Sequence, residues 1–321
     1  NDIGGSSALT GNTVTNYANL PTASAYPGVP LTVVVGTYMM NQQAYNVSYN
    51  SLTTASLTSA SGIRAILADY VTVLPTGTFS NNITNNTLTV TQAGAGGVQV
   101  VTTQSTAGVA SGVTLNINNN SVINCAITNA VTLFCLANLG AYGNLNINGN
   151  TIRGNTSTAA NNGFVGITHQ VGLIPGTISI QNNNIGTGSG SNGAFQSTVA
   201  ASSTGQSFAG ITVTAATTTT NVNISGNTLQ GFQSVTLPTG TGTGMVGIQL
   251  SNTSGAPGGS ININNNNFGT ASVPLLTVTN AATSAVTGIS CSSGLATATL
   301  SISGNIYRGI TYNTLSTSAN T

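Results

Sequence analysis

An eight-residue pattern of apolar and polar positions recurs along the whole chain. It reads apolar, any residue, Ile, polar, Asn or Gly, Asn, any residue, apolar, as in residues 145–152 (LNINGNTI). Close copies of this segment lie at 115–122, 178–185, 222–229, 261–268 and 300–307. Looser copies, in which another apolar residue can replace the Ile, lie at 7–14, 45–52 and 81–88. A motif that covers the chain in this way indicates a repeat architecture.

Each copy predicts two short strands that meet at a corner. Apolar and polar residues alternate over the first four positions, which is typical of a half-buried β-strand. Asn and Gly tolerate a left-handed backbone, and an Asn side chain can bond nearby backbone groups, so the pair in the middle marks a sharp turn. A corner at the same place in every copy predicts a coil that always turns the same way.

Two further apolar phrases lie between the motif copies. One is a Gly-Ile phrase at 165–167, 209–211, 246–248 and 287–289, for which 61–63 is a candidate earlier copy. The other is less regular and occurs at 195–199, 235–237 and 275–278. Each repeat thus contains about three short strands, joined by turns rich in Gly, Asn, Ser and Thr.

The sixth motif position is Asn in every copy, at intervals of 30 to 44 residues. We therefore predict an all-β fold, a parallel β-helix of about nine coils, as a single domain over residues 1–321. Strands of successive coils would pair about 4.8 Å apart. Identical amides would stack at the corner, as they do in cross-β structures. The predicted structural ladder is Asn12, Asn50, Asn86, Asn120, Asn150, Asn183, Asn227, Asn266 and Asn305.

The repeat resembles that of the pectate-lyase-like right-handed parallel β-helices. The resemblance covers nearly the whole chain and implies a right-handed coil, in agreement with the usual handedness of parallel crossovers. Helices of this kind occur in polysaccharide lyases and hydrolases, phage tailspikes, adhesins and surface proteins. The resemblance therefore predicts the architecture and leaves the function open.

Charge is almost absent. The chain has three Arg, two Asp and one His, with no Lys and no Glu. Such a chain lacks the electrostatic footprint for nucleic acid or for an anionic membrane. It also has no apolar run long enough to span a bilayer. The first residue is Asn, from which we expect a removed leader, secretion and an extracellular or cell-surface location.

The sequence predicts no catalytic, cofactor-binding or metal-binding residues. Glycoside hydrolysis usually needs two nearby carboxyl groups, and only Asp2 and Asp69 are present. The pectate lyases that the repeat resembles use acidic calcium ligands and a basic proton acceptor, and this chain lacks the acidic cluster. His169 and Asp69 fall three coils apart, roughly 14 Å, which is too far for the hydrogen bond of a catalytic triad.

The cysteines allow two interpretations. Cys125 and Cys135 lie ten residues apart and could form a disulfide in an oxidising compartment. Equally, they and Cys291 fit the role of small buried hydrophobic residues, and their scattered positions lack the spacing of a zinc site. Sequons such as those at Asn46 and Asn155 permit surface glycans, although many would occur by chance in a chain so rich in Asn and Thr.

We expect self-assembly from the predicted solenoid. Motif copies reach close to both ends of the sequence, without an amphipathic helix or a cluster of Lys, Glu or Pro to guard the sheet edges. Open coils would then stack into a homopolymer of identical subunits, or residues 1–37 would donate a strand to a neighbour. The hypothesis is a structural subunit of an extracellular filament.

Two other functions stay open at this point. One is a surface adhesin or an ice-binding solenoid, although the Thr-x-Thr phrases at 212–214 and 297–299 do not recur at a constant offset. The other is a carbohydrate-active enzyme or a tailspike.

Overall fold

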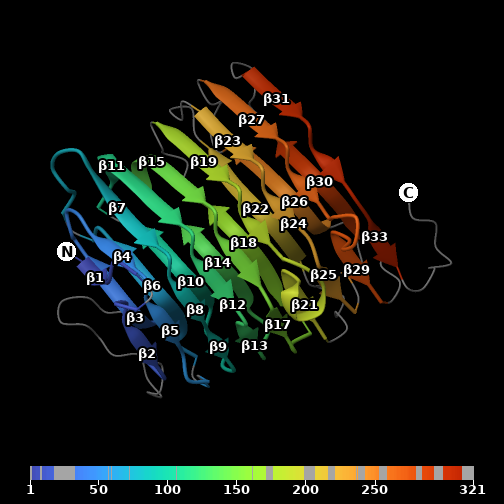
Figure 1. Ribbon diagram of the computed structural model, residues 1–321, viewed down its shortest axis with the longest axis horizontal. Coiled ribbons are helices and arrows are strands. Elements are labelled where there is room, and N and C mark those ends of the chain that lie inside the picture. Colours follow the sequence, from blue (N-terminus) through green and yellow to red (C-terminus); the bar gives the residue numbers. More distant parts are fainter. Residues whose placement is uncertain are drawn as a thin grey trace.

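The structure is a computed structural model in which four parallel sheets run along one solenoid. It describes residues 2–7, 9–17, 33–56, 58, 60–71, 73–105, 107–160, 162–170, 176–198, 207–215, 221–235, 237, 243–252, 259–279, 284–292 and 299–312. The first coil and the last lie at opposite ends of the long axis (Figure 1). Over the described residues, the one helical element is the 3-10 turn η1 (Gly190–Asn192).

Sheets 1 and 2 carry the repeated motif and have nine strands each. Sheet 1 consists of β1 (Asp2–Gly4), β4 (Asn46–Ser48), β7 (Phe79–Thr84), β11 (Val109–Asn118), β15 (Ala141–Asn148), β19 (Thr177–Gln181), β23 (Asn221–Ser225), β27 (Ser260–Asn264) and β31 (Thr299–Ser303). Sheet 2 consists of β2 (Thr13–Thr15), β5 (Ser51–Thr53), β8 (Thr87–Thr89), β12 (Ser121–Ile123), β16 (Thr151–Arg153), β20 (Asn184–Ile185), β24 (Thr228–Leu229), β28 (Asn267–Phe268) and β32 (Ile306–Tyr307).

Sheets 3 and 4 close each coil. The seven strands of sheet 3 are β9 (Thr91–Gln92), β13 (Ala126–Ile127), β17 (Asn155–Ser157), β21 (Phe195–Ser197), β25 (Phe232–Ser234), β29 (Leu276–Val278) and β33 (Ile310–Tyr312). The eight strands of sheet 4 are β3 (Val33–Met40), β6 (Gly62–Asp69), β10 (Val98–Gln104), β14 (Thr132–Asn138), β18 (Gly163–His169), β22 (Ser207–Ala215), β26 (Thr243–Asn252) and β30 (Ala285–Ser292).

The architecture confirms the predicted parallel β-helix of about nine coils. Each strand pairs in parallel with its counterpart one coil away, so residues at one motif position form a column along the solenoid. The expected three strands per coil hold for the first two coils. A fourth strand of two or three residues, in sheet 3, appears from β9 onward. Strands this short carry no readable period, which explains why the sequence did not separate them clearly.

Inward side chains fill the bore from end to end. The Ile column of sheet 1 is fully buried in the middle coils, with Ile117, Ile147 and Ile180 at 0% exposure. Aromatic rings occupy the corner between sheets 3 and 4, where Phe164 and Phe195 stack with centroids 4.8 Å apart. Outward positions on the strands of sheet 1 that carry this Ile column are polar, so the alternation seen in the sequence follows the boundary between bore and surface there.

A column of glycines in sheet 4 makes room for large side chains across the bore. Gly210 and Gly247 lie in register with Gly166 and Gly288, between paired Ile and Val positions. A Cβ on Gly247 would lie 2.4 Å from Cε1 of Phe268, and one on Gly210 would lie 2.1 Å from Cδ2 of Leu229. The glycines of the Gly-Ile phrase therefore leave space for the last apolar residue of the motif copy that follows them in the chain.

The proposed early copy of this phrase at 61–63 is wrong. Ile63 aligns with Val98, whereas the phrase's Ile column continues through Ile66 and Val101. In this coil the column that holds the later glycines contains Ala65, between Arg64 and Ile66. The register between coils, rather than the local Gly-Ile phrase, shows which residue belongs to the column.

We expect Gly247→Ala to destabilise the fold by about 1–3 kcal/mol, because the added methyl meets a rigid ring. Combining it with Phe268→Val should recover only part of the lost stability. The carbonyl oxygen of Gly288 would still lie 2.6 Å from the new Cβ of residue 247. Gly97→Ala is the matched control, because a Cβ at Gly97 meets nothing within 4 Å. Denaturant unfolding measures all three. Equal midpoints for Gly247→Ala and Gly97→Ala would contradict this packing.

Candidate functional site

All nine predicted asparagines lie in one column at the corner between sheets 1 and 2. From Asn12 to Asn266, the side-chain Nδ2 of each donates a hydrogen bond to Oδ1 of the next Asn toward the C-terminus, at 2.9 to 3.1 Å. The backbone N–H of the same Asn donates to that oxygen as well, for example from Asn150 to Asn183 at 2.9 Å. The ladder therefore has a direction, with donors facing the C-terminus.

The ladder amides are fully buried and fully bonded in the middle coils. Asn120, Asn150 and Asn183 have 0% exposure. The second Nδ2 proton of each goes to a backbone oxygen of sheet 1, as from Asn150 to Ile117 O at 2.8 Å. Each Oδ1 accepts two bonds from the preceding Asn. Because a buried polar group is costly only when unbonded, the column is stable as long as its neighbours keep their register.

The left-handed residue at the corner is the one before the ladder Asn, which refines the sequence interpretation. That position has positive φ in Asn85, Asn119, Asn182 and Asn265, and in Gly149, Gly226 and Gly304. Tyr49 adopts the same conformation at φ 58° in the second coil. The fifth motif residue thus turns the chain, while the sixth supplies the amide.

A second row of amides runs along the outside of sheet 1 in the opposite sense. Nδ2 of Asn146 donates to Asn116 and Nδ2 of Asn116 donates to Asn82, both at 2.8 Å. Asn82 donates to Asn46, and Asn46 donates to Oδ1 of Asp2 at 2.6 Å. These side chains face solvent, so the outer row adds little to stability compared with the buried one.

The last coil exposes apolar side chains whose counterparts one coil earlier are buried. Leu300, Ile302, Tyr307 and Ile310 face inward and are 39%, 47%, 55% and 44% exposed. Their counterparts one coil earlier, Ile261, Ile263, Phe268 and Leu276, are all at 0%. Among the described residues, the last coil thus presents a group of exposed apolar side chains, which commonly marks an interaction site.

The two ends of the ladder are chemically complementary. At the first coil, no described residue donates a hydrogen bond to Oδ1 of Asn12, whose Nδ2 donates onward to Asn50. At the last coil, Asn305 accepts from Asn266. Its Nδ2 donates to Ile263 O, and its backbone N–H meets no acceptor among the described residues. One end therefore presents an acceptor and the other presents donors.

The disulfide considered from the sequence is not formed. Cys125, Cys135 and Cys291 are free thiols. Cys125 and Cys135 are completely buried and pack in the bore as small apolar residues. Burial raises the pKa of the Cys125 thiol to about 12 and raises the pKa of Cys135 as well, so both stay protonated at neutral pH. Protonated, buried thiols are poor nucleophiles.

The residues weighed for catalysis lie apart. Register places His169 beside Asn138, Asn138 beside Thr103, and Thr103 beside Ala68, so three coils separate His169 from Asp69. The His169 ring is buried, with Nδ1 2.9 Å from Asn138 Nδ2. Among the described residues there is no group of three His, Cys, Asp or Glu that could hold a metal ion.

The sequons named above, at Asn46 and Asn155, differ in access. Asn46 is exposed on sheet 1. Asn155 is 1% exposed, and its Nδ2 donates to Ala194 O at 3.2 Å. A glycan on Asn155 is therefore incompatible with the folded core. Of these two sequons, only the one at Asn46 is accessible to a surface glycan.

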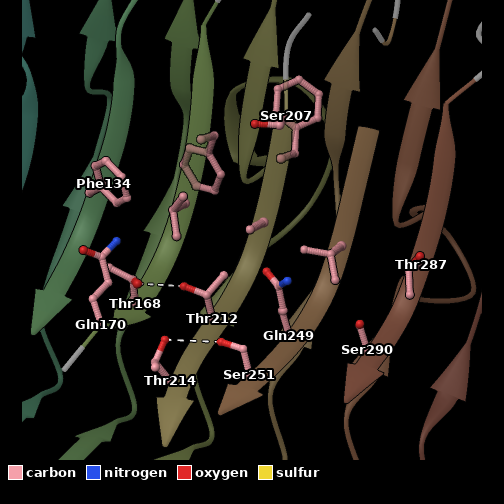
Figure 2. A pocket seen from close by; sticks show the side chains of 15 residues that line it. Phe134, Thr168, Gln170, Ser207, Thr212, Thr214, Gln249, Ser251, Thr287 and Ser290 are labelled. Carbon is pink, nitrogen blue, oxygen red and sulfur yellow. Dashed lines mark hydrogen bonds between the residues drawn. The ribbon is translucent and has the colours of Figure 1, made fainter. Parts of the chain in front are cut away.

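A shallow groove of about 410 Å³ crosses the outer face of sheet 4 (Figure 2). Phe134, Val165 and Val246 form an apolar column along one side. A parallel polar column includes Thr168, whose Oγ1 accepts a hydrogen bond from Thr212 at 2.7 Å, and Gln249 in the next coil. The described residues that line the groove include no charged side chain.

Comparison of the chain with models of known protein families, with curated proteins and with solved structures finds no match. The class of protein is therefore defined by the fold alone, as a parallel β-helix solenoid. Among the described residues, no helix has the length and apolar character needed to cross a membrane.

We expect Asn150→Ala to cost at least about 3 kcal/mol of folding stability, because it leaves several buried partners unbonded at once. The partners are the donors of Asn120, the oxygen of Ile117 and Oδ1 of Asn183. Asn146→Ala on the same strand-and-turn unit is the control and should change stability by about 0.5 kcal/mol or less, because its amide faces water. Urea unfolding of both variants measures the difference in stability. Similar losses would contradict the claim that the buried ladder contributes more to stability than the outer row of amides.

Proposed function

We propose that this protein is the structural subunit of an extracellular filament, which grows by stacking the end of one solenoid on the start of another. The apolar end of the last coil carries the proposal. Leu300, Ile302 and Tyr307 lie exposed in positions whose counterparts are buried in the coil before. A following coil would cover them, as each coil inside the subunit covers its predecessor.

Three properties support assembly by this route. The contact would join different surfaces of identical subunits, and such a contact propagates as a fibre unless it closes on itself. The strand edges at an open coil offer unpaired N–H and C=O groups along all sheets of that coil. The near absence of charge removes the repulsion that ordinarily keeps soluble proteins apart, and contacts of this kind depend little on salt.

The proposal is of a non-catalytic protein. His169 is buried three coils from Asp69, and the other carboxylate, Asp2, is bonded to Asn46. The right-handed coil, the likeness to pectate-lyase-like helices, secretion and the extracellular location belong to the same proposal. They rest on the repeat and on the composition of the chain.

Purified protein should form filaments visible by electron microscopy, with an axial repeat of roughly 43 Å if nine coils stack at the strand spacing. The double variant Ile302→Lys, Tyr307→Lys should abolish them, because two charges would have to be buried in the contact. Both side chains are already half-exposed, so the variant subunit should fold with an unchanged circular dichroism spectrum.

Ser301→Lys is the matched control for this test. Ser301 lies between Leu300 and Ile302 on β31, but its column faces the outside of sheet 1. The Ser301→Lys protein should polymerise like the original. A wild-type chain that stays monomeric at high concentration, or a double variant that polymerises normally, would overturn the proposal.

Binding of a neutral polysaccharide is a second candidate, favoured by the groove over sheet 4. Apolar Phe134 and Val165 could contact sugar ring faces beside the hydroxyls and amide of Thr168, Thr212 and Gln249 (Figure 2). The lack of charge favours a neutral chain over an acidic one.

A panel of soluble neutral polysaccharides, with polygalacturonate as the acidic comparison, tests the second candidate by affinity electrophoresis. We expect retardation by a neutral member. The variant Thr212→Val, Gln249→Ala should lose this retardation through the loss of its hydrogen-bonding groups, whereas Asn146→Ala on sheet 1 should keep it. Retardation by none of the sugars, or by polygalacturonate alone, would exclude the candidate.

A further inference from the structure

We infer that the subunit contact is a coaxial, in-register continuation of the coil stack, in which β31 and β32 of one copy pair with β1 and β2 of the next. This inference rests on the proposed function and defines its interface. It also gives the filament one polarity, with every subunit pointing the same way.

The apolar columns match from one end of the subunit to the other. The column that ends at Ile302 begins at Ile3, and the column that ends at Tyr307 begins at Val14. Both first-coil residues, Ile3 and Val14, are only partly buried in the single subunit. Stacking in register therefore places Ile3 of one copy on Ile302 of another, and Val14 on Tyr307.

The direction of the ladder selects the head-to-tail order. Inside the subunit, the backbone N–H and Nδ2 of each Asn donate to Oδ1 of the Asn in the following coil. In register, the donors of Asn305 would meet the open acceptor Oδ1 of Asn12 in the next copy. Two first coils placed together would instead oppose two acceptors, and two last coils would oppose two sets of donors. Only the head-to-tail order extends the ladder.

The first coil is already part of its own solenoid, which disfavours donation of residues 1–37 as a strand. β1 pairs with β4, β2 pairs with β5, and β3 pairs with β6 of the same chain. Residues 18–32 of that segment lie outside the described residues. Donation would require breaking these parallel pairs, whereas coaxial stacking keeps them and adds new ones.

Paired cysteines on the outside of sheet 2 test the register. The outward column of Thr13 ends at Ile306 one subunit length later. In register, Thr13 of one copy would face Ile306 of its neighbour about 4.8 Å away, within the reach of a disulfide. The double variant Thr13→Cys, Ile306→Cys should therefore cross-link between subunits under mild oxidation, giving a ladder of covalent oligomers on a denaturing gel without reductant.

The pair Thr15→Cys, Ile306→Cys is the matched control. Thr15 lies on the same strand and face as Thr13, two residues further along. In register its Cα would lie about 8 Å from that of residue 306, too far for a disulfide. The Ile306→Cys single variant controls for the native thiols, of which Cys291 is partly exposed.

The outcomes separate the two proposals. Filaments with cross-links in the Thr13 pair and not in the Thr15 pair establish the coaxial register. Filaments that cross-link through Thr15, or through neither pair, overturn this inference and leave the filament function standing. A wild-type chain that forms no filaments overturns the proposed function itself.

Discussion

The fold depends on the hydrogen bonding of an amide removed from water. A buried Asn must satisfy two protons and two lone pairs, and in this bore the partners come from the coils on either side. The carbonyl oxygen of Ile117, the amide of Asn120 and Oδ1 of Asn183 all meet at Asn150. A slip of one residue in either neighbouring coil would leave these groups unbonded, so the ladder fixes the register of sheets 1 and 2 wherever it runs.

Coil length can vary because register is fixed at the corner. The spacing between ladder asparagines ranges from 30 to 44 residues, yet the column stays continuous. The bore adapts in a similar way. Where Phe268 and Leu229 reach across the solenoid, Gly247 and Gly210 stand opposite them. Volume is thus balanced across the bore, while hydrogen bonding is balanced between coils.

The ends of the subunit can be described in the same terms, apolar packing and hydrogen bonding. A coil in the middle has its amide donors, amide acceptors and apolar side chains covered on both sides, and the last coil has them covered on one side. If the filament forms as proposed, the contact between subunits would be physically the same as the contact between coils. It would need no charged pairs, which agrees with a chain that carries five charged side chains among its Asp and Arg residues.

The sequence by itself determined the features that depend on local chemistry. The alternation in 145–152 predicted a half-buried strand, and the recurrence of Asn at one motif position predicted the column from Asn12 to Asn305, because strand period and turn chemistry are properties of a few adjacent residues. The tertiary structure decided what depends on other coils. It assigned the left-handed turn to Asn119 and Gly149 rather than to the ladder Asn, buried the sequon at Asn155, left Cys125 and Cys135 as free thiols, and placed the glycine column opposite Phe268. These outcomes depend on side chains that are not adjacent in the sequence and become neighbours only once the chain has coiled.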